Sequence, residues 1–233
     1  MIQFEDHAVA FIDVCGFKSV VEEAVNSPKK LAELDALVKL LGGVVPLLDS
    51  GVDQSAVPVS CIPRHIYISD CLILSAPMKP AVSMRNYDGL AILVMRVIQI
   101  FQHLLDRGFL MRGGIDVGPV WHDSTNVVGT AYQNAYALEG RARAPRVILS
   151  KVAADAWFSG AQRQGNQMCI EYERQTIVDC LHTYYIPARF GGDISAAHQH
   201  YKRVIDQNLK AGLDFDVHAK WDWIHRYLLT HGL

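Results

Sequence analysis

Residues 8–18 read Ala-Val-Ala-Phe-Ile-Asp-Val-Cys-Gly-Phe-Lys and decide the fold, because they join a buried strand to a helix. The run Ala8–Val14 is apolar apart from Asp13, which is typical of a strand buried on both faces. Gly16 then turns the chain into a helical segment. The stretch therefore predicts a strand–helix unit at the start of the core.

The sequence that follows extends this unit into a longer alternation. A helix opened by Ser27-Pro28 comes first, followed by two strands over residues 66–74 with a turn at Ser69-Asp70. A helix from about Tyr87 to Gly108 leads into a strand over Phe109–Val117, which Gly118-Pro119 turns back. After a polar loop at Trp121–Asn126, the next predicted helix covers Tyr132–Arg143. The core order is strand, helix, strand, strand, helix, strand. That order is the ferredoxin-like βαββαβ arrangement of an α+β protein.

The pattern changes near residue 150. Residues 1–150 carry the predicted core. Residues 151–233 hold a mostly helical extension that we expect to pack on it. Its predicted parts are a helix over Lys151–Phe158, one or two strands within Glu171–Ile186, and helices over residues 196–233 broken near Gly212.

Composition narrows the class of partner. The 233 residues are 50% apolar and 20% charged, with a net charge of −2, which excludes a disordered chain and argues against a basic surface for nucleic acid. No stretch is long and uncharged enough for a membrane span, and the N-terminal residues lack a signal-peptide pattern. Five cysteines without a C-x-x-C pair favour a reducing compartment. We expect a cytoplasmic protein with no membrane or nucleic-acid partner.

Two carboxylates are candidate metal ligands. Asp13 ends the first predicted strand, and Asp70 lies in the turn of the following hairpin. In a split sheet these strands can be neighbours, and two close carboxylates relieve their repulsion by protonation or by a divalent cation. A hard cation such as Mg²⁺ or Mn²⁺ would take both, with the carbonyl of Val14 as a third ligand. In the alternative, Asp13 caps a helix and Asp70 serves only the turn.

The connection from Val14 to Lys18 is a candidate phosphate-binding loop. Unpaired backbone N–H groups at a helix start bind phosphate oxygens, Gly16 permits close approach, and Lys18 adds a positive charge. The same residues also fit a plain strand–helix connection.

These pieces together resemble class III nucleotide cyclases. The matching stretches are Phe11-Ile-Asp13-Val-Cys-Gly16-Phe17, Ser69-Asp70, Arg112-Gly-Gly114-Ile115 with Gly118-Pro119-Val120, Gly129 with Ala135 and Leu138-Glu139, and Val147-Ile-Leu-Ser150. They cover about residues 8–150. The variant Arg-Gly-Gly-Ile, with Ala135-Tyr136-x-Leu-Glu139, is most similar to the pyrimidine cyclases of bacterial Pycsar antiphage systems.

The resemblance implies a ferredoxin-like core that works as a head-to-tail homodimer, with substrate held between protomers. One protomer would hold two divalent cations, Mn²⁺ or Mg²⁺, on Asp13 and Asp70. The phosphate-binding loop predicted above would add Gly16, Phe17 and Lys18 as contacts to the substrate. The cations would activate the 3′-hydroxyl of a nucleoside triphosphate for attack on the α-phosphorus and neutralise the leaving pyrophosphate.

The sequence departs from the purine cyclases at the positions that read the base. These positions fall on Ile66 and Asn126. An apolar Ile66 offers no hydrogen bond to a purine, whereas the Asn126 amide offers a donor and an acceptor that suit uracil or cytosine. The positions that contact the transition state fall on Gln133 and Ala137, so an arginine is missing.

Two arginines are candidates to replace that missing cation. Arg112 lies beside the glycine pair, and Arg141 lies one helical turn beyond Ala137. Either would stabilise charge on the α-phosphate. Each also fits a surface or structural role.

The leading hypothesis is a cyclase that makes 3′,5′-cyclic UMP from UTP and releases pyrophosphate. Through the Pycsar resemblance, the product would be a second messenger in antiphage defence, read by a separate effector protein. One alternative is a cytidylate cyclase that makes cyclic CMP from CTP, and another is a non-catalytic nucleotide-binding sensor of the same fold. A ferredoxin-like RNA-binding module is a third possibility, disfavoured because the chain lacks aromatic-rich strands and a basic surface.

Overall fold

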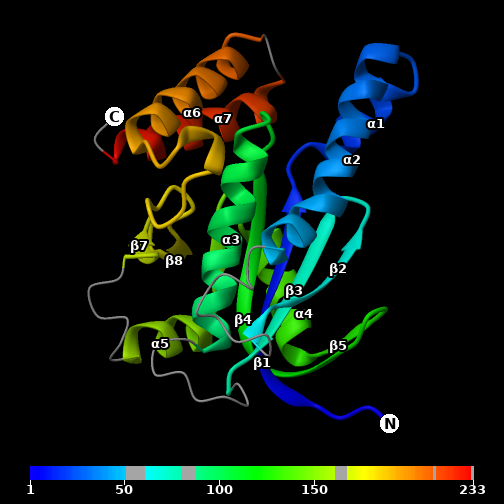
Figure 1. The fold of residues 1–233 in the computed structure, drawn as a ribbon, viewed down its shortest axis with the longest axis vertical. Coiled ribbons are helices and arrows are strands. Elements are labelled where there is room, and N and C mark those ends of the chain that lie inside the picture. The colour runs from blue at the N-terminus through cyan, green and yellow to red at the C-terminus, as the bar shows by residue number, and fades with distance from the viewer. Residues whose placement is uncertain (51–60, 80–87, 161–166, 212–213, 232–233) are drawn as a thin grey trace.

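The computed structural model describes residues 1–50, 61–79, 88–160, 167–211 and 214–231. One sheet runs through the molecule in the strand order β2-β3-β1-β4-β6-β8-β7, with β5 paired to β4. Helices cover both faces of this sheet (Figure 1). The predicted α+β class is therefore confirmed.

The first four strands form the predicted ferredoxin-like unit. They are β1 (Glu5–Val14), β2 (Arg64–Ile68), β3 (Cys71–Pro77) and β4 (Met111–His122). All pairs among them are antiparallel, in the order β2-β3-β1-β4. The turn between β2 and β3 lies at Ser69-Asp70, as predicted, and Ser69 has a φ of 60°.

One face of the sheet is covered by helices that the sequence predicts well. They are α2 (Pro28–Asp49) and α3 (Gly89–Leu105), while α1 (Phe17–Ala24) packs on α2. Ser27 accepts a hydrogen bond from the Lys30 N–H at 3.4 Å, with Pro28 as the first helical residue. Helix α3 starts after Asp88, which caps it, while the predicted start at Tyr87 lies outside the described residues. Leucine, isoleucine and valine side chains from α2, α3 and the strands form the larger hydrophobic core.

Helix α4 (Thr130–Arg141) covers the opposite face. It packs on a second apolar cluster that includes Phe11, Ile73 and Ala135. The helix approaches β4 closely at Gly114, where an added Cβ would meet the Ala135 carbonyl oxygen at 2.3 Å. Only glycine fits at that contact.

Two predictions about β4 are wrong. Gly118-Pro119 does not end the strand, because β4 continues to His122 and pairs with β1 as far as Val120. The predicted polar loop Trp121–Asn126 is shorter, since β5 (Val127–Gly129) pairs with β4 from Val120 onward. Pro119 lies outside the stretches of β4 that pair with β5 and β6. Among the described residues, the edge of β4 that faces away from β1 therefore has no strand partner at Pro119, and a residue without a backbone N–H is tolerated there.

The C-terminal residues extend the same sheet and then add helices. The additional elements are β6 (Val147–Leu149), α5 (Lys151–Ser159), β7 (Cys169–Tyr172), β8 (Gln175–Val178), a 3-10 turn (Ala188–Phe190), α6 (Ile194–Leu209) and α7 (Phe215–Leu229). Strand β6 runs parallel to β4, and β8 pairs with β6. Within the predicted Glu171–Ile186 stretch, strand structure ends at Val178. The expected break at Gly212 lies outside the described residues.

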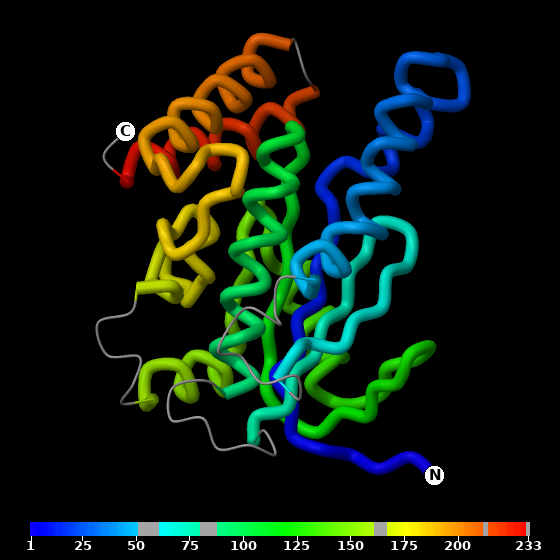
Figure 2. The backbone as a smooth tube through the Cα atoms, viewed as in Figure 1, coloured from blue at the N-terminus to red at the C-terminus, as the bar shows by residue number. Residues whose placement is uncertain are grey.

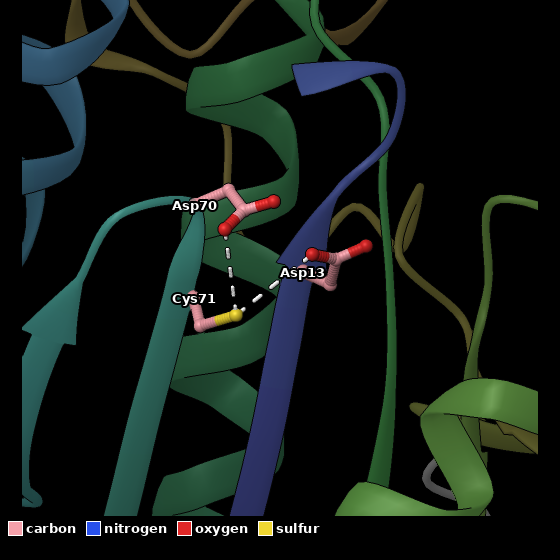
Figure 3. A group of neighbouring side chains, drawn as sticks. All are labelled: Asp13, Asp70 and Cys71. Carbon is pink, nitrogen blue, oxygen red and sulfur yellow. Dashed lines mark hydrogen bonds between the residues drawn. The ribbon is translucent and has the colours of Figure 1, made fainter. Parts of the chain in front are cut away.

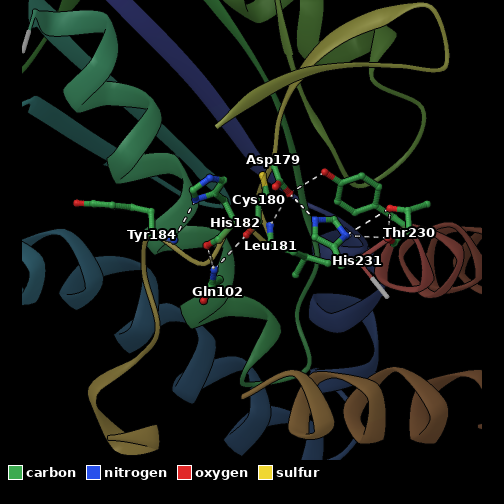
Figure 4. A network of polar contacts seen from close by, with 9 residues as sticks. Gln102, Asp179, Cys180, Leu181, His182, Tyr184, Thr230 and His231 are labelled. Carbon is green, nitrogen blue, oxygen red and sulfur yellow. Dashed lines mark hydrogen bonds and ion pairs between the residues drawn. The ribbon is translucent and has the colours of Figure 1, made fainter. Parts of the chain in front are cut away.

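The α6–α7 pair is joined to the sheet by a polar network around Asp179 (Figure 4). Asp179 is buried and accepts hydrogen bonds from Tyr227 Oη at 2.8 Å and His231 Nε2 at 3.0 Å. The tube in Figure 2 shows α6–α7 and the α1–α2 hairpin at the same end of the molecule, away from the N-terminus. None of the described helices combines the length and apolar character that crossing a lipid bilayer requires.

Candidate active site

The sheet brings Asp13 and Asp70 together, as the split arrangement predicts. Asp13 is opposite Cys71 in the β1–β3 register, and Asp70 directly precedes Cys71. The backbone N–H of Val14 donates to the Asp70 carbonyl oxygen at 3.1 Å, which ties the end of β1 to the β2–β3 turn. Figure 3 shows both carboxyl groups at the ends of these adjacent strands.

Cys71 completes a cluster of three potential metal ligands. One oxygen of each carboxyl group and the Cys71 sulfur all lie within 4.8 Å of one another. The sulfur lies 3.8 Å from Asp13 Oδ1 and 3.7 Å from Asp70 Oδ1 (Figure 3). No sequence motif marks this thiol, although it follows Asp70 directly and its strand position faces Asp13.

Arg112 and Glu139 form the second layer of charge. Arg112 is the second residue of β4 and lies opposite Asp13, with its Nε 3.3 Å from Asp13 Oδ2. The same Nε lies 2.5 Å from Oε1 of Glu139, which α4 carries in a buried position. Arg112 is therefore brought to the carboxylate pair within a single chain. Glu139 appears in the matched family pattern, but no charge role follows from the sequence because the pairing crosses from strand to helix.

The electrostatics of Asp13 fit a cation site. Burial, followed by the nearby Asp70 and Glu139 carboxylates, raises the pKa of Asp13 to about 6, while Arg112 opposes the shift. A carboxylate held among other carboxylates is stabilised by a proton or by a divalent cation. The oxygen donors of Asp13 and Asp70 are those that Mg²⁺ and Mn²⁺ prefer. The residues present fit a divalent cation.

The candidate phosphate-binding loop lies next to this cluster. Gly16 has a φ of 79° and precedes the first residue of α1, so the N–H groups of the first helical turn have no partner within the helix. Phe17 is half-buried against the main core, whereas Lys18 is exposed and lies 3.7 Å from Glu22. The structure thus packs Phe17 against the core and leaves the Lys18 ammonium in solvent.

The other candidate residues lie apart from the carboxylate pair. Asn126 belongs to the β4–β5 hairpin, at the opposite end of β4 from Arg112, and its side chain accepts from the Val127 N–H at 2.8 Å. Ile66, on β2, lies opposite Ile73 of β3 and packs half-buried against the apolar cluster under α4. Gln133 and Arg141 are exposed on α4. Among the described residues, no hydrogen bond or ion pair joins any of these four to Asp13 or Asp70.

Known structures share this arrangement of elements. The chain is similar to the guanylyl cyclase domain of the RhoGC fusion protein from the aquatic fungus Blastocladiella emersonii, with a TM-score of 0.50 and 15% identity over 75% of this chain and 94% of that one. It is also similar to the adenylyl cyclase CyaB from P. aeruginosa, with a TM-score of 0.49 and 15% identity over 76% and 94% of the two chains. A third similar structure is the adenylate/guanylate cyclase/hydrolase from Silicibacter pomeroyi, with a TM-score of 0.49 and 13% identity over 76% and 96%.

No family model matches the sequence, and no curated protein matches it. The structural similarity shows the fold at this low identity. The chain therefore has the fold of a class III nucleotide cyclase domain, as the sequence motifs predicted.

Proposed function

We propose that the protein is a nucleotide cyclase that converts UTP to 3′,5′-cyclic UMP and pyrophosphate. The convergence of Asp13 and Asp70 at one end of the cyclase fold carries the proposal. Two divalent cations, Mn²⁺ or Mg²⁺, would be held by these two carboxylates and the Val14 carbonyl. When bound, they supply polarisation of the 3′-hydroxyl and neutralisation of the leaving pyrophosphate.

The chain's own groups would then position and balance the substrate. The N–H groups that follow Gly16 bind the triphosphate, with Phe17 fixing the loop against the core. Arg112, already beside Asp13, places a positive charge near the α-phosphate while the 3′-oxygen forms its bond to phosphorus and the bond to the bridging oxygen of the pyrophosphate breaks. Arg141 is the alternative source of this charge, reaching the site of a second protomer.

A homodimer would complete the site. Among the described residues, no hydrogen bond or ion pair joins Asn126, Ile66 or Gln133 to the carboxylates of their own chain. Two chains packed head to tail would bring these residues from one protomer to the Asp13–Asp70 pair of the other.

Base choice would follow from Ile66 and Asn126. Ile66 is half-buried against apolar neighbours and offers no hydrogen bond. The Asn126 amide is on an exposed hairpin and has a donor and an acceptor for the edge of a pyrimidine. This pair favours a pyrimidine over a purine. UTP is the proposed substrate, with CTP as the alternative substrate and cyclic CMP as its product.

The cyclic nucleotide would serve as a second messenger in antiphage defence. In this proposal the reaction takes place in the cytoplasm, and a separate effector protein binds the product. The role rests on the motif resemblance to pyrimidine cyclases.

The direct test is product analysis. The purified chain is incubated with each of the four nucleoside triphosphates and Mn²⁺, and the products are identified by mass spectrometry. Cyclic UMP is the expected main product, and the Asp13→Asn and Asp70→Ala variants should form none. Cyclic AMP or cyclic GMP as the main product would overturn the base assignment.

One observation favours a second candidate, a nucleotide-binding sensor without turnover. Ala137 is exposed on α4 where the family has an arginine, so this position cannot stabilise a transition state. A sensor would bind triphosphate tightly, release no pyrophosphate, and be unaffected in binding by Asp70→Ala.

A further inference from the structure

A cavity of about 400 Å³ lies between the α1–α2 hairpin and the α6–α7 pair, the two helical units that Figure 2 shows at the same end of the molecule. Its lining extends from Gly16, at the start of α1, to Lys220 and Trp221 of α7. Neither Asp13 nor Asp70 is among the described residues that line it. The volume is within the range of small-molecule sites in proteins. The proposed cyclase reaction leaves this cavity without a role.

One part of the cavity wall is apolar. Leu110 and Trp221 are buried in the main hydrophobic core, and Phe109 and Val217 are half-buried against it. Val20 lines the cavity from α1. The aliphatic or aromatic body of a ligand would lose its contact with water against these side chains, which favours binding.

The charged residues of the lining differ in whether the chain already pairs them. Lys30 lies 3.2 Å from Glu23 and 3.0 Å from Glu33. Asp214 accepts a hydrogen bond at 2.9 Å from a backbone N–H in the first turn of α7. Lys220 is different, since no hydrogen bond or ion pair joins its ammonium to another of the described residues. The cavity therefore offers one cation that is free to bind a ligand.

The position of the charges limits the kind of ligand. Burial raises the pKa of the Cys15 thiol to about 12, and the positive charge of Lys220 opposes that rise more strongly than Arg112 does. The Lys220 side chain is therefore close to Cys15, which packs on the core. The carboxylates of Glu23 and Glu33 are more exposed and would repel a ligand with several negative charges. A single negative charge fits this arrangement better than a phosphate group does.

We propose that this cavity binds a small organic monoanion, whose carboxylate pairs with Lys220 and whose aromatic or aliphatic body packs on Trp221 and Val20. The inference goes beyond the proposed cyclase reaction, because it uses neither carboxylate of the candidate metal site. A ligand in the cavity would contact Gly16, which opens the candidate phosphate-binding loop, and would bridge that turn to α7.

The test compares three probes that share one apolar body and differ in charge. Phenylbutyrate, phenylbutyramide and phenylbutylamine are each titrated into the full-length protein, without nucleotide or metal, by isothermal titration calorimetry. Phenylbutyrate should bind at least about tenfold more tightly than the neutral amide or the cationic amine, because it alone forms a charge-assisted hydrogen bond to the ammonium.

Three variants locate the site. Lys220→Met keeps the length of the side chain and removes its charge, so the three probes should bind within about twofold of one another. Lys202→Met, at an exposed lysine of α6 outside the lining, is the matched control and should keep the preference for phenylbutyrate. Val20→Trp fills part of the cavity and should weaken all three probes by at least about tenfold, with circular dichroism as the check of its fold.

Tryptophan fluorescence gives a second measurement that does not depend on the cavity-filling variant. Bound phenylbutyrate should change the tryptophan emission of the wild type, and Trp221→Phe should lose that change because Trp221 is in the cavity wall. The fluorescence change should survive in Trp223→Phe, a second tryptophan of α7 outside the lining.

Several results would overturn the proposal. They are equal binding of the three probes by the wild type, a preference that survives Lys220→Met, undiminished binding by folded Val20→Trp, and an emission change that persists in Trp221→Phe. Tighter binding of the amine would also overturn it, since the acidic edge would then select the ligand. Failure of these titrations would leave the cyclase proposal intact, and absence of cyclic nucleotide would leave the cavity site intact.

Discussion

Arg112 faces Asp13 across the β1–β4 pair, and its Nε lies 3.3 Å from Asp13 Oδ2 and 2.5 Å from Glu139 Oε1. One guanidinium thus joins a carboxylate from a strand to a carboxylate from the helix above it. Its positive charge opposes the rise in the pKa of Asp13 that burial and the Asp70 carboxylate cause. Arg112 therefore keeps Asp13 closer to the ionised state that binds a cation.

Arg112 is expected to act on the site of its own chain. Arg112→Ala should lower kcat by about 10²- to 10³-fold, the usual cost of removing one group that stabilises transition-state charge. Because Arg112 and Asp70 would serve the same site, a mixture of Arg112→Ala and Asp70→Ala chains should stay inactive. Recovery of activity on mixing would show that Arg112 acts on the partner's site instead.

Asn126 is expected to act on the other chain's site. Asn126→Ala and Asp70→Ala should each be inactive alone, yet their mixture should recover activity, because a mixed dimer contains one complete site. Random pairing of equal amounts makes half of the dimers mixed, so the recovered rate should be about one quarter of the wild-type rate. No recovery would contradict a shared site.

Asp13 should destabilise the metal-free fold at neutral pH. The pKa of Asp13 is raised from 3.8 to about 6, so the folded chain binds the carboxyl proton more tightly than the unfolded chain does. The stability that this proton gives the fold is present at low pH and is lost as the pH rises through 6. Asp13→Asn should therefore raise the free energy of unfolding by about 1–3 kcal/mol at pH 8 and change it little at pH 4. Urea unfolding without metal measures this.

The exposed Asp35 provides the control for that experiment. Asp35→Asn removes a carboxylate paired with Lys39 on the surface and should have little effect at either pH. Added Mn²⁺ should stabilise wild type and not Asp13→Asn. A loss of stability in Asp13→Asn at pH 8 would contradict the electrostatic account.

His122 should make the protein sensitive to acid. Its Nδ1 lies 2.7 Å from the buried Ser75 hydroxyl, and its Nε2 has no hydrogen-bond partner among the described residues. Burial lowers the pKa of His122 from 6.5 to about 4. The unfolded chain therefore binds the proton first, and stability falls as the pH drops from about 6.5 toward 4. In pH-dependent urea unfolding, His122→Asn should flatten this decline, whereas His218→Asn, an exposed histidine, should leave it unchanged. An equal decline in both variants would contradict the prediction.

Tyr227 should anchor the C-terminal helices. Its hydroxyl donates to Asp179 at 2.8 Å in a buried position. Tyr227→Phe leaves that carboxylate short of one donor and should cost about 1–3 kcal/mol in unfolding free energy. Tyr136→Phe, at an exposed tyrosine on α4, should cost almost nothing. Equal unfolding curves for the two variants would show that the network in Figure 4 does not hold α7 to the sheet.

Local patterns were enough to predict most of the core. The apolar run before Asp13, the turn at Ser69-Asp70 and the Ser27-Pro28 helix start all act within a few residues, and the structure confirms each of them. The convergence of Asp13 and Asp70 also followed, since the split arrangement makes their strands neighbours.

Features that depend on pairing between distant segments could not be predicted in this way. The continuation of β4 past Pro119 depends on β1 and β5 as partners, which override the local turn signal of Gly118-Pro119. Cys71 gains its place as a potential ligand from the β1–β3 register, and Arg112 meets Glu139 only because α4 folds back over β4. A single cysteine or arginine carries no sign of such a neighbour in its local sequence.

At Gly114 the backbone of helix α4 lies directly against the strand below, because the strand carries no side chain there. An added Cβ would meet the Ala135 carbonyl oxygen at 2.3 Å and Leu138 Cβ at 2.4 Å, so the helix rests directly on the backbone. A shift of β4 at Gly114 would therefore press directly on the α4 backbone. The guanidinium on the strand and the Glu139 carboxylate on the helix are therefore held across a direct backbone contact, which leaves repacking of apolar side chains little room to change their spacing.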